Sequence, residues 1–154
     1  MKWLPPLLGI VLAAILGTAG GLKLMDPFTF SRDIEHYQLL VSPWTGLLAV
    51  YLPWLEVLTA VTLLFPHWRR GAATVALGLS LVFAAALTSA AMRGLDVRCG
   101  CFGSHAPTTV MAALGGAVGV ALLAAAVVGL ERRRERRGAA TENPPAASSA
   151  ESNL

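Results

Sequence analysis

Charged residues are scarce in this sequence. They make up 14% of its 154 residues, whereas 55% are apolar, and the mean hydropathy is +0.62. A soluble domain carries about a quarter charged residues. This composition excludes an ordinary soluble core, and the short length allows one domain at most. We therefore expect the chain to bury its apolar surface in lipid.

Four stretches almost free of charge are long enough to cross a bilayer, which takes about 20 mainly apolar residues in a helix. Because lipid cannot hydrogen-bond the backbone, an open chain can cross only as helices. We predict an all-α fold, an integral membrane four-helix bundle formed by residues 1–137. Its spans are expected at about residues 4–24, 45–66, 71–92 and 108–130.

The first span lacks a clean A-x-A cleavage site. Lys2, the apolar run and the small residues at 17–21 are also typical of a cleaved signal peptide. We favour a retained helix because the run is long for a signal core. Pro5 and Pro6 stand at its start, where proline is well tolerated.

The basic residues predict the orientation. With four spans, eight of the twelve Lys and Arg residues fall on the side of the termini, among them Arg69, Arg70 and five arginines within 132–137. The positive-inside rule then predicts cytoplasmic termini in the cell inner (plasma) membrane, with loops 23–44 and 93–107 extracytoplasmic. The arginine run is expected to contact anionic lipid. The net charge of +3 therefore needs no nucleic acid to explain it.

The C-terminal segment 138–154 nearly lacks large apolar residues and is rich in Pro, Ala and Ser. Such a segment cannot bury enough surface to fold. We predict a disordered cytoplasmic tail.

The sequence has only two cysteines, and both lie in one short motif. The motif reads Arg98-Cys99-Gly100-Cys101-Phe102-Gly103 and falls in the second extracytoplasmic loop. Disulfides persist in an oxidising compartment. A Cys-x-Cys disulfide closes a small, strained ring that adds little stability, and strained, exposed disulfides are the exchangeable ones. We predict catalytic thiol–disulfide exchange by the two cysteines, supported by their four neighbours in the motif.

The cysteines have three other interpretations: two unrelated thiols, a structural turn and a metal site. His105 follows four residues after Cys101, and His36 in the first loop could join it. A closed structural zinc site needs four ligands, and only three candidates are close in sequence. We therefore predict no metal site. Arg98 either favours a thiolate or is an ordinary interfacial arginine.

Glu56 is the one acidic residue inside the second span. An ionisable group in lipid is expensive and is a functional candidate by default. Glu56 could stay protonated, relay protons, pair with Lys23 or a helix Ser or Thr, or serve a structural hydrogen bond. Pro53, three residues earlier, is expected to kink the helix.

The first extracytoplasmic loop is expected to hold a short amphipathic helix at the interface. Asp26 and Pro27 end one helix and open the next, and the apolar positions that follow have helical spacing: 28, 30, 34, 37 and 40. This helix either covers the cysteine loop or anchors in lipid.

Two pairs of glycines stand four residues apart, Gly17 with Gly21 and Gly115 with Gly119. The spacing fits close helix packing, although the abundance of Gly and Ala explains it equally well.

Four motifs carry a resemblance to a known family. They read G-G-L-K-L-x-D-P-x-x-F at 20–30, I-E-H-Y-Q-L-L at 34–40, L-P-W-L-E at 52–56 and C-G-C-F-G at 99–103. Together they resemble the methylamine utilisation protein MauE family, which is related to DoxX-like redox-associated membrane proteins. The resemblance covers roughly residues 5–130. The matching positions are Lys23, Asp26, Pro27, Tyr37, Pro53, Glu56, Cys99, Cys101, Phe102 and Gly103.

The resemblance implies a four-helix redox protein linked to a thioredoxin-like partner and to disulfide-rich clients, as in methylamine dehydrogenase maturation. Our hypothesis is that the cysteine pair exchanges with such an extracytoplasmic partner. A quinone near Glu56 is a candidate electron carrier that no residue pattern requires. The alternatives are a non-enzymatic assembly subunit with structural or metal-binding cysteines, and a small-molecule carrier using Glu56 and Lys23.

Overall fold

Five helices form the described part of the chain. The computed structural model describes residues 3–37, 44–94 and 110–142. In chain order the helices are α1 (Leu4–Met25), α2 (Pro27–His36), α3 (Trp44–Leu63), α4 (Arg69–Met92) and α5 (Val110–Glu142). Four of them, all but α2, are long and apolar enough to cross a membrane. The predicted all-α membrane bundle with a short helix between the first two spans is therefore confirmed.

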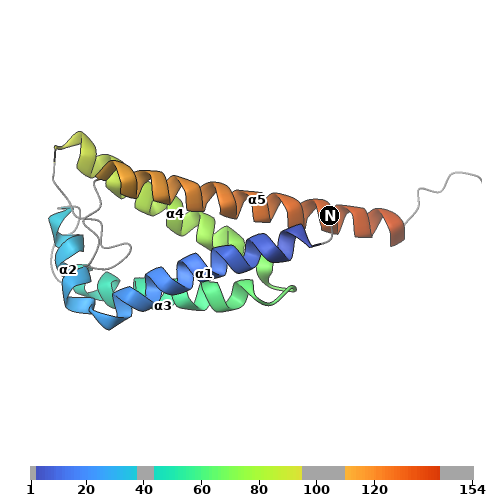
Figure 1. Ribbon diagram of the computed structural model, residues 1–154, viewed down its shortest axis with the longest axis horizontal. Helices are drawn as coiled ribbons and strands as arrows, with labels where there is room; N and C mark the ends of the chain where they lie inside the picture. Colours follow the sequence, from blue (N-terminus) through green and yellow to red (C-terminus); the bar gives the residue numbers. More distant parts are fainter. Residues whose placement is uncertain (1–2, 38–43, 95–109, 143–154) are drawn as a thin grey trace, which may run out of the picture.

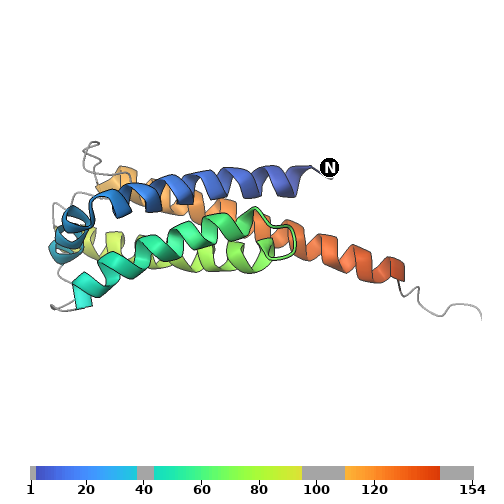
Figure 2. The same ribbon diagram turned by 90° about the horizontal axis from the view of Figure 1, so that it is seen from below.

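The four long helices form two closely packed pairs. α1 runs along α3, and α4 runs along α5. The short α2 lies across one end of the bundle against the start of α3 (Figure 1). The short turn between α3 and α4 lies at the opposite end, and α5 extends beyond the other helices there (Figures 1 and 2). The bundle thus has an end that carries α2 and an end that carries the α3–α4 turn.

Small residues fill most of the bundle interior. Apart from Leu12, Leu16 and Leu63, the core cluster consists mainly of alanines, among them Ala60, Ala73, Ala76 and Ala124. Large apolar side chains instead point outward, and several on α1, α3 and α4 are half or more exposed. Lipid tails are as apolar as leucine, so membrane helices pack through small residues that let their backbones approach.

Gly20 marks a close approach between α1 and α3. A Cβ built on Gly20 would lie 3.0 Å from the backbone oxygen of Pro53 and from the Cβ of Glu56. Gly17 meets only Ala60, at 3.7 Å. The predicted packing partner Gly21 has no atom within 4 Å of such a Cβ. The prediction that Gly17 and Gly21 make the close contact was therefore wrong in position, because the contact runs through Gly20.

The second glycine pair plays no such role. A Cβ on Gly115 or Gly119 would meet no atom of the described residues within 4 Å. Abundance of glycine on α5 explains that pair better than a packing motif does.

Local chemistry accounts for most helix ends. Pro5 and Pro6 begin α1 in its first turn, where a missing amide proton is harmless. Asp26 caps α2 by accepting a hydrogen bond from the Thr29 amide, 3.1 Å away. Gly94 follows the end of α4 with a φ of 63°, the left-handed conformation that commonly terminates helices.

Two sequence expectations differ from the observed helices. α5 continues to Glu142, five residues into the segment expected to be a disordered tail; residues 143–154 lie outside the described part. In α2, Phe28 is 82% exposed whereas Phe30 is 6% exposed. Two positions on a helix are about 200° apart, so the predicted apolar stripe cannot place both on one face.

The Gly20 contact gives a test of helix packing. Gly20→Val should destabilise the protein by about 1–3 kcal/mol, because overpacking forces α1 away from the α3 backbone. Gly21→Val is the matched control on the same helix and should have a much smaller effect. The midpoint of SDS-induced unfolding in detergent micelles measures both. Equal effects would show that α1 and α3 do not approach at Gly20.

Candidate functional site

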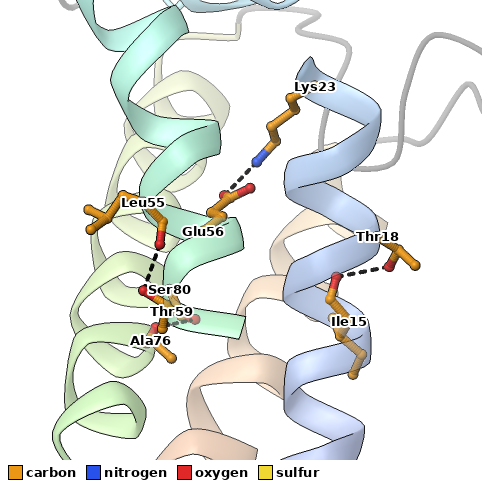
Figure 3. Close-up of polar contacts among 8 residues, drawn as sticks. All are labelled: Ile15, Thr18, Lys23, Leu55, Glu56, Thr59, Ala76 and Ser80. Atoms are coloured by element: carbon orange, nitrogen blue, oxygen red, sulfur yellow. Dashed lines mark hydrogen bonds and ion pairs between the residues drawn. The ribbon is translucent and has the colours of Figure 1, made fainter. Parts of the chain in front are cut away.

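A buried ion pair joins α1 to α3 near the end of the bundle that carries α2. Lys23 comes from the last turn of α1, and Glu56 comes from the middle of α3. The Lys23 Nζ donates to Glu56 Oε1 at 2.6 Å, and both side chains are 3–4% exposed. Figure 3 shows the two side chains reaching toward each other across the gap between their helices. Of the roles considered for Glu56, the structure shows the pairing with Lys23.

Two aromatic rings enclose the Lys23 ammonium. Its Nζ lies 5.1 Å from the centroid of the Phe30 ring and 4.6 Å from that of Phe83. A cation within about 6 Å of a ring face is attracted by the ring quadrupole, and more strongly when desolvated. Phe30 belongs to α2 and Phe83 to α4, so Lys23 connects four helices of the bundle.

Glu56 keeps one oxygen without a partner. Its Oε2 is buried and accepts no hydrogen bond from the described residues. In Figure 3 this oxygen lies on the side of the carboxylate nearer α1. Buried polar atoms are nearly always satisfied, so an orphaned carboxylate oxygen in a native structure requires an explanation.

A small cavity of about 70 Å³ adjoins the pair. Among the described residues, its polar lining consists of Lys23, Glu56 and Ser80, and apolar side chains from α1, α4 and α5 form the remainder. The Ser80 hydroxyl donates to the Ala76 carbonyl at 2.8 Å (Figure 3). The site therefore combines one ion pair, one hydroxyl oxygen and an apolar wall.

This cavity bears on the expected quinone. An engineered cavity of about 150 Å³ holds one benzene molecule, which is about twice the volume available beside Glu56. The space that the described residues leave beside Glu56 is therefore smaller than a quinone ring needs.

Asp26 and Tyr37, two other predicted site residues, position α2. Asp26 accepts hydrogen bonds from the amide and hydroxyl of Thr29, and these bonds hold the pKa of the Asp26 carboxyl below its ordinary value. The Tyr37 carbonyl accepts a hydrogen bond of 3.0 Å from Arg93, which follows α4. Burial raises the pKa of the Tyr37 phenol. Both residues thus fix the ends of α2.

The predicted cysteine motif lies outside the described residues, as do Arg98, Gly100, Phe102 and Gly103. The structure does show where the chain leaves and re-enters the bundle on either side of it. α4 ends at Met92 and α5 begins at Val110, and both points lie at the end that carries α2 (Figure 1).

A second polar cluster at the opposite end was missed in the sequence. Arg69 pairs with Glu131 at 3.2 Å, and both are buried. Its Nε also donates to the Leu63 carbonyl at 3.1 Å, and its side chain lies against Gly9 of α1. Arg70 pairs with Glu135 at the surface. The sequence signal was two glutamates four residues apart within the arginine run, which places them on one helix face.

The fold and these sites define a multi-pass, all-α membrane protein whose spanning helices are tied by buried ion pairs. The chain belongs to the methylamine utilisation protein MauE family, because that family's model matches residues 1–130. This confirms the resemblance found in the sequence.

A curated relative is similar over part of its length. The methylamine utilization protein MauE of Methylophilus methylotrophus is 34% identical over 93 residues, which is 60% of this chain and 49% of the relative. The chain therefore spans about half the length of this relative. No solved structure matches the chain.

The Lys23–Glu56 pair can be tested with a double-mutant cycle. Lys23→Met and Glu56→Met should each destabilise the protein by about 3–5 kcal/mol, because each leaves a buried charge without its partner. The double variant should recover most of that loss, since it buries no charge. Unfolding in SDS measures the coupling. Additive losses would mean that the two side chains do not interact.

The two ion pairs at the other end provide a matched comparison. Glu131→Ala removes the partner of a buried arginine and should cost about 3–5 kcal/mol. Glu135→Ala, one turn further along α5, breaks an exposed pair and should cost less than about 1 kcal/mol. Thermal melts followed by circular dichroism in detergent distinguish the two variants. A larger loss of stability in Glu135→Ala than in Glu131→Ala would contradict the assignment of Arg69–Glu131 as the buried pair.

Proposed function

We propose that this protein is a membrane redox component that exchanges thiol and disulfide equivalents through Cys99 and Cys101 with an extracytoplasmic thioredoxin-like protein. The observation that supports the proposal best is that the motifs of the family converge at one end of the bundle. The chain segment with both cysteines departs from and returns to the end at which the other family motifs meet. Those motifs supply Lys23, Glu56 and the capped helix α2.

The helix α2 is well placed to act as part of a docking platform. Phe30 is buried beside Lys23, and Arg93, just after α4, donates a hydrogen bond to the carbonyl of Tyr37, the residue that follows α2. Phe28 and Met25 remain more than four-fifths exposed. A fixed helix with exposed apolar side chains supports a partner surface next to the thiols, although lipid contact also fits those side chains.

The exchange needs only the two thiols and a partner disulfide. One cysteine thiolate attacks a sulfur of the partner disulfide, forming a mixed disulfide and releasing the partner's other thiolate. The second cysteine thiolate then attacks its neighbour's sulfur and releases the reduced partner. The pair Cys99–Cys101 loses two electrons and the partner gains them; the reverse sequence oxidises the partner.

The physiological setting is proposed from the family. The relative's name refers to methylamine utilisation, so we infer that the clients are disulfide-containing proteins of that process, such as a methylamine-dehydrogenase-like enzyme. The charge distribution supports placing the cysteine end outside the plasma membrane. The opposite end carries Arg69, Arg70 and the arginines that begin at Arg132, as the positive-inside rule requires of a cytoplasmic side.

An assembly subunit without redox activity is the second candidate. The buried ion pairs join α1 to α3 at one end and α4 to α5 at the other, and neither pair involves a thiol. Such a bundle would serve as a scaffold for a partner even if the cysteines were structural or bound a metal.

Trapping experiments separate these two functions. If exchange occurs, Cys101→Ser or Cys99→Ser should accumulate a mixed disulfide with the partner, because the resolving thiol is missing. Non-reducing electrophoresis of acid-quenched membranes, followed by mass spectrometry of the adduct, measures it. The double variant Cys99→Ser with Cys101→Ser is the control and should form no adduct.

A second readout tests the side of the membrane. A membrane-impermeant, mass-tagged maleimide applied to intact cells should label both cysteines only after mild reduction. Full labelling without reduction, together with no adduct in either single variant and partner copurification from the double variant, would favour the assembly function.

A further inference from the structure

The unpartnered oxygen of Glu56 and the adjoining cavity together make a built site. Glu56 is 3% exposed, and its Oε2 is unsatisfied among the described residues. The cavity beside Glu56 has a volume of about 70 Å³. An acceptor buried this deeply in a membrane bundle is costly unless a donor reaches it.

The free polar atoms define what the site accepts. The Ser80 hydroxyl donates its hydrogen bond to the Ala76 carbonyl. Its oxygen can therefore only accept a hydrogen bond from a ligand in the cavity. Glu56 Oε2 is also an acceptor. The ligand must therefore carry an N–H or O–H donor. Lys23 has two N–H groups beyond the one directed at Glu56 Oε1, so a ligand atom that also accepts would bridge the ammonium and the carboxylate.

Charge and size narrow the ligand further. The Lys23–Glu56 pair is neutral overall, and an additional net charge inside the bilayer would be expensive. The cavity is about half the size of one that holds benzene, which limits the ligand to a few non-hydrogen atoms. Its other end must be apolar, because Ile15, Ala113 and Val120 are among the lining residues.

We propose that this cavity binds a small neutral molecule with one group that both donates and accepts a hydrogen bond, namely an alcohol or an unprotonated primary amine of one to three carbons. Its polar atom donates to Glu56 Oε2, and its carbon end lies against α5. Gly116 lines the cavity and is exposed on the bundle surface, so a ligand dissolved in the bilayer can enter between the helices there. The inference does not rest on the cysteine chemistry.

Direct binding tests the proposal on the full chain in lipid nanodiscs. Saturation-transfer NMR titrations would use ethanol, ethylamine and dimethyl ether, with empty nanodiscs to correct for partition into lipid. For a ligand of three non-hydrogen atoms, ligand efficiency limits the dissociation constant to roughly millimolar. We expect saturable binding of ethanol or ethylamine, and the two arms distinguish the alcohol from the amine. Dimethyl ether, which has no donor, should not saturate.

Two variants locate the site. Gly116→Leu should place side-chain carbons in the cavity, since a Cβ there meets no described atom within 4 Å. Gly119→Leu is the matched control one turn along the same helix, outside the cavity lining, and should bind normally. Glu56→Gln should weaken binding at least about tenfold, because a hydrogen bond to a charged group is lost. Circular dichroism checks that each variant is folded.

Each outcome decides the proposal. Saturable binding that is lost in Gly116→Leu and kept in Gly119→Leu supports it. Absence of saturable binding to the folded wild-type chain overturns it and leaves water as the only occupant of the cavity. Equal binding by wild type and Gly116→Leu, or by dimethyl ether, overturns it as well. The double cysteine-to-serine variant should bind as wild type does, so failure of the redox proposal would leave this result intact.

Discussion

The buried ion pair between Lys23 and Glu56 is the constraint on which the rest of this bundle depends. A lysine near the end of a span can usually extend its ammonium to the interface. Here it turns inward and meets the carboxylate at 2.6 Å. Each charge is tolerable in lipid only beside the other, so the pair fixes the depth and rotation of α1 against α3. Gly20, one turn before Lys23, must then be small because the α3 backbone is 3.0 Å from where its Cβ would be.

At the opposite end of the bundle, different residues form a second buried ion pair between helices. Arg69 reaches Glu131 on α5 and the last carbonyl of α3, and it lies against Gly9 of α1. An arginine can do this because its planar guanidinium presents several donors at once. Directional contacts therefore hold both ends, whereas the middle depends on small apolar residues. The cavity beside Glu56 lies where α5 offers mainly small side chains, Ala113, Gly116 and Ala117, to the other helices.

The sequence predicted the spans well because lipid imposes a simple rule. A charge-free run of about 20 residues has to be a helix. It also singled out Lys23 and Glu56, because an ionisable residue is conspicuous in an apolar run. Their pairing was one of several options, since hydropathy says nothing about which faces of two apolar helices meet. The same lack of an amphipathic pattern hid Gly20 and Phe83. Glu131 was hidden for another reason: it adjoins a run of arginines that suggested lipid contact alone.

The helix α2 links the two chemistries proposed for this end of the bundle. The Phe30 ring lies 5.1 Å from the Lys23 ammonium, and the carbonyl of Tyr37, directly after α2, accepts a hydrogen bond from Arg93, where the chain leaves α4. The attraction between Phe30 and Lys23 depends on the charge of the ammonium. That charge in turn depends on Glu56 remaining an effective partner. A donor bound to Glu56 Oε2 would compete with Lys23 for the carboxylate's negative charge, and a partner docked on α2 would press Phe30 against the same cation. Binding free energies are reciprocal, so if occupancy of the cavity changes the stability of α2, docking on α2 must change the affinity of the cavity by the same factor. Phe30 is the described residue through which such a coupling would reach the surface of α2.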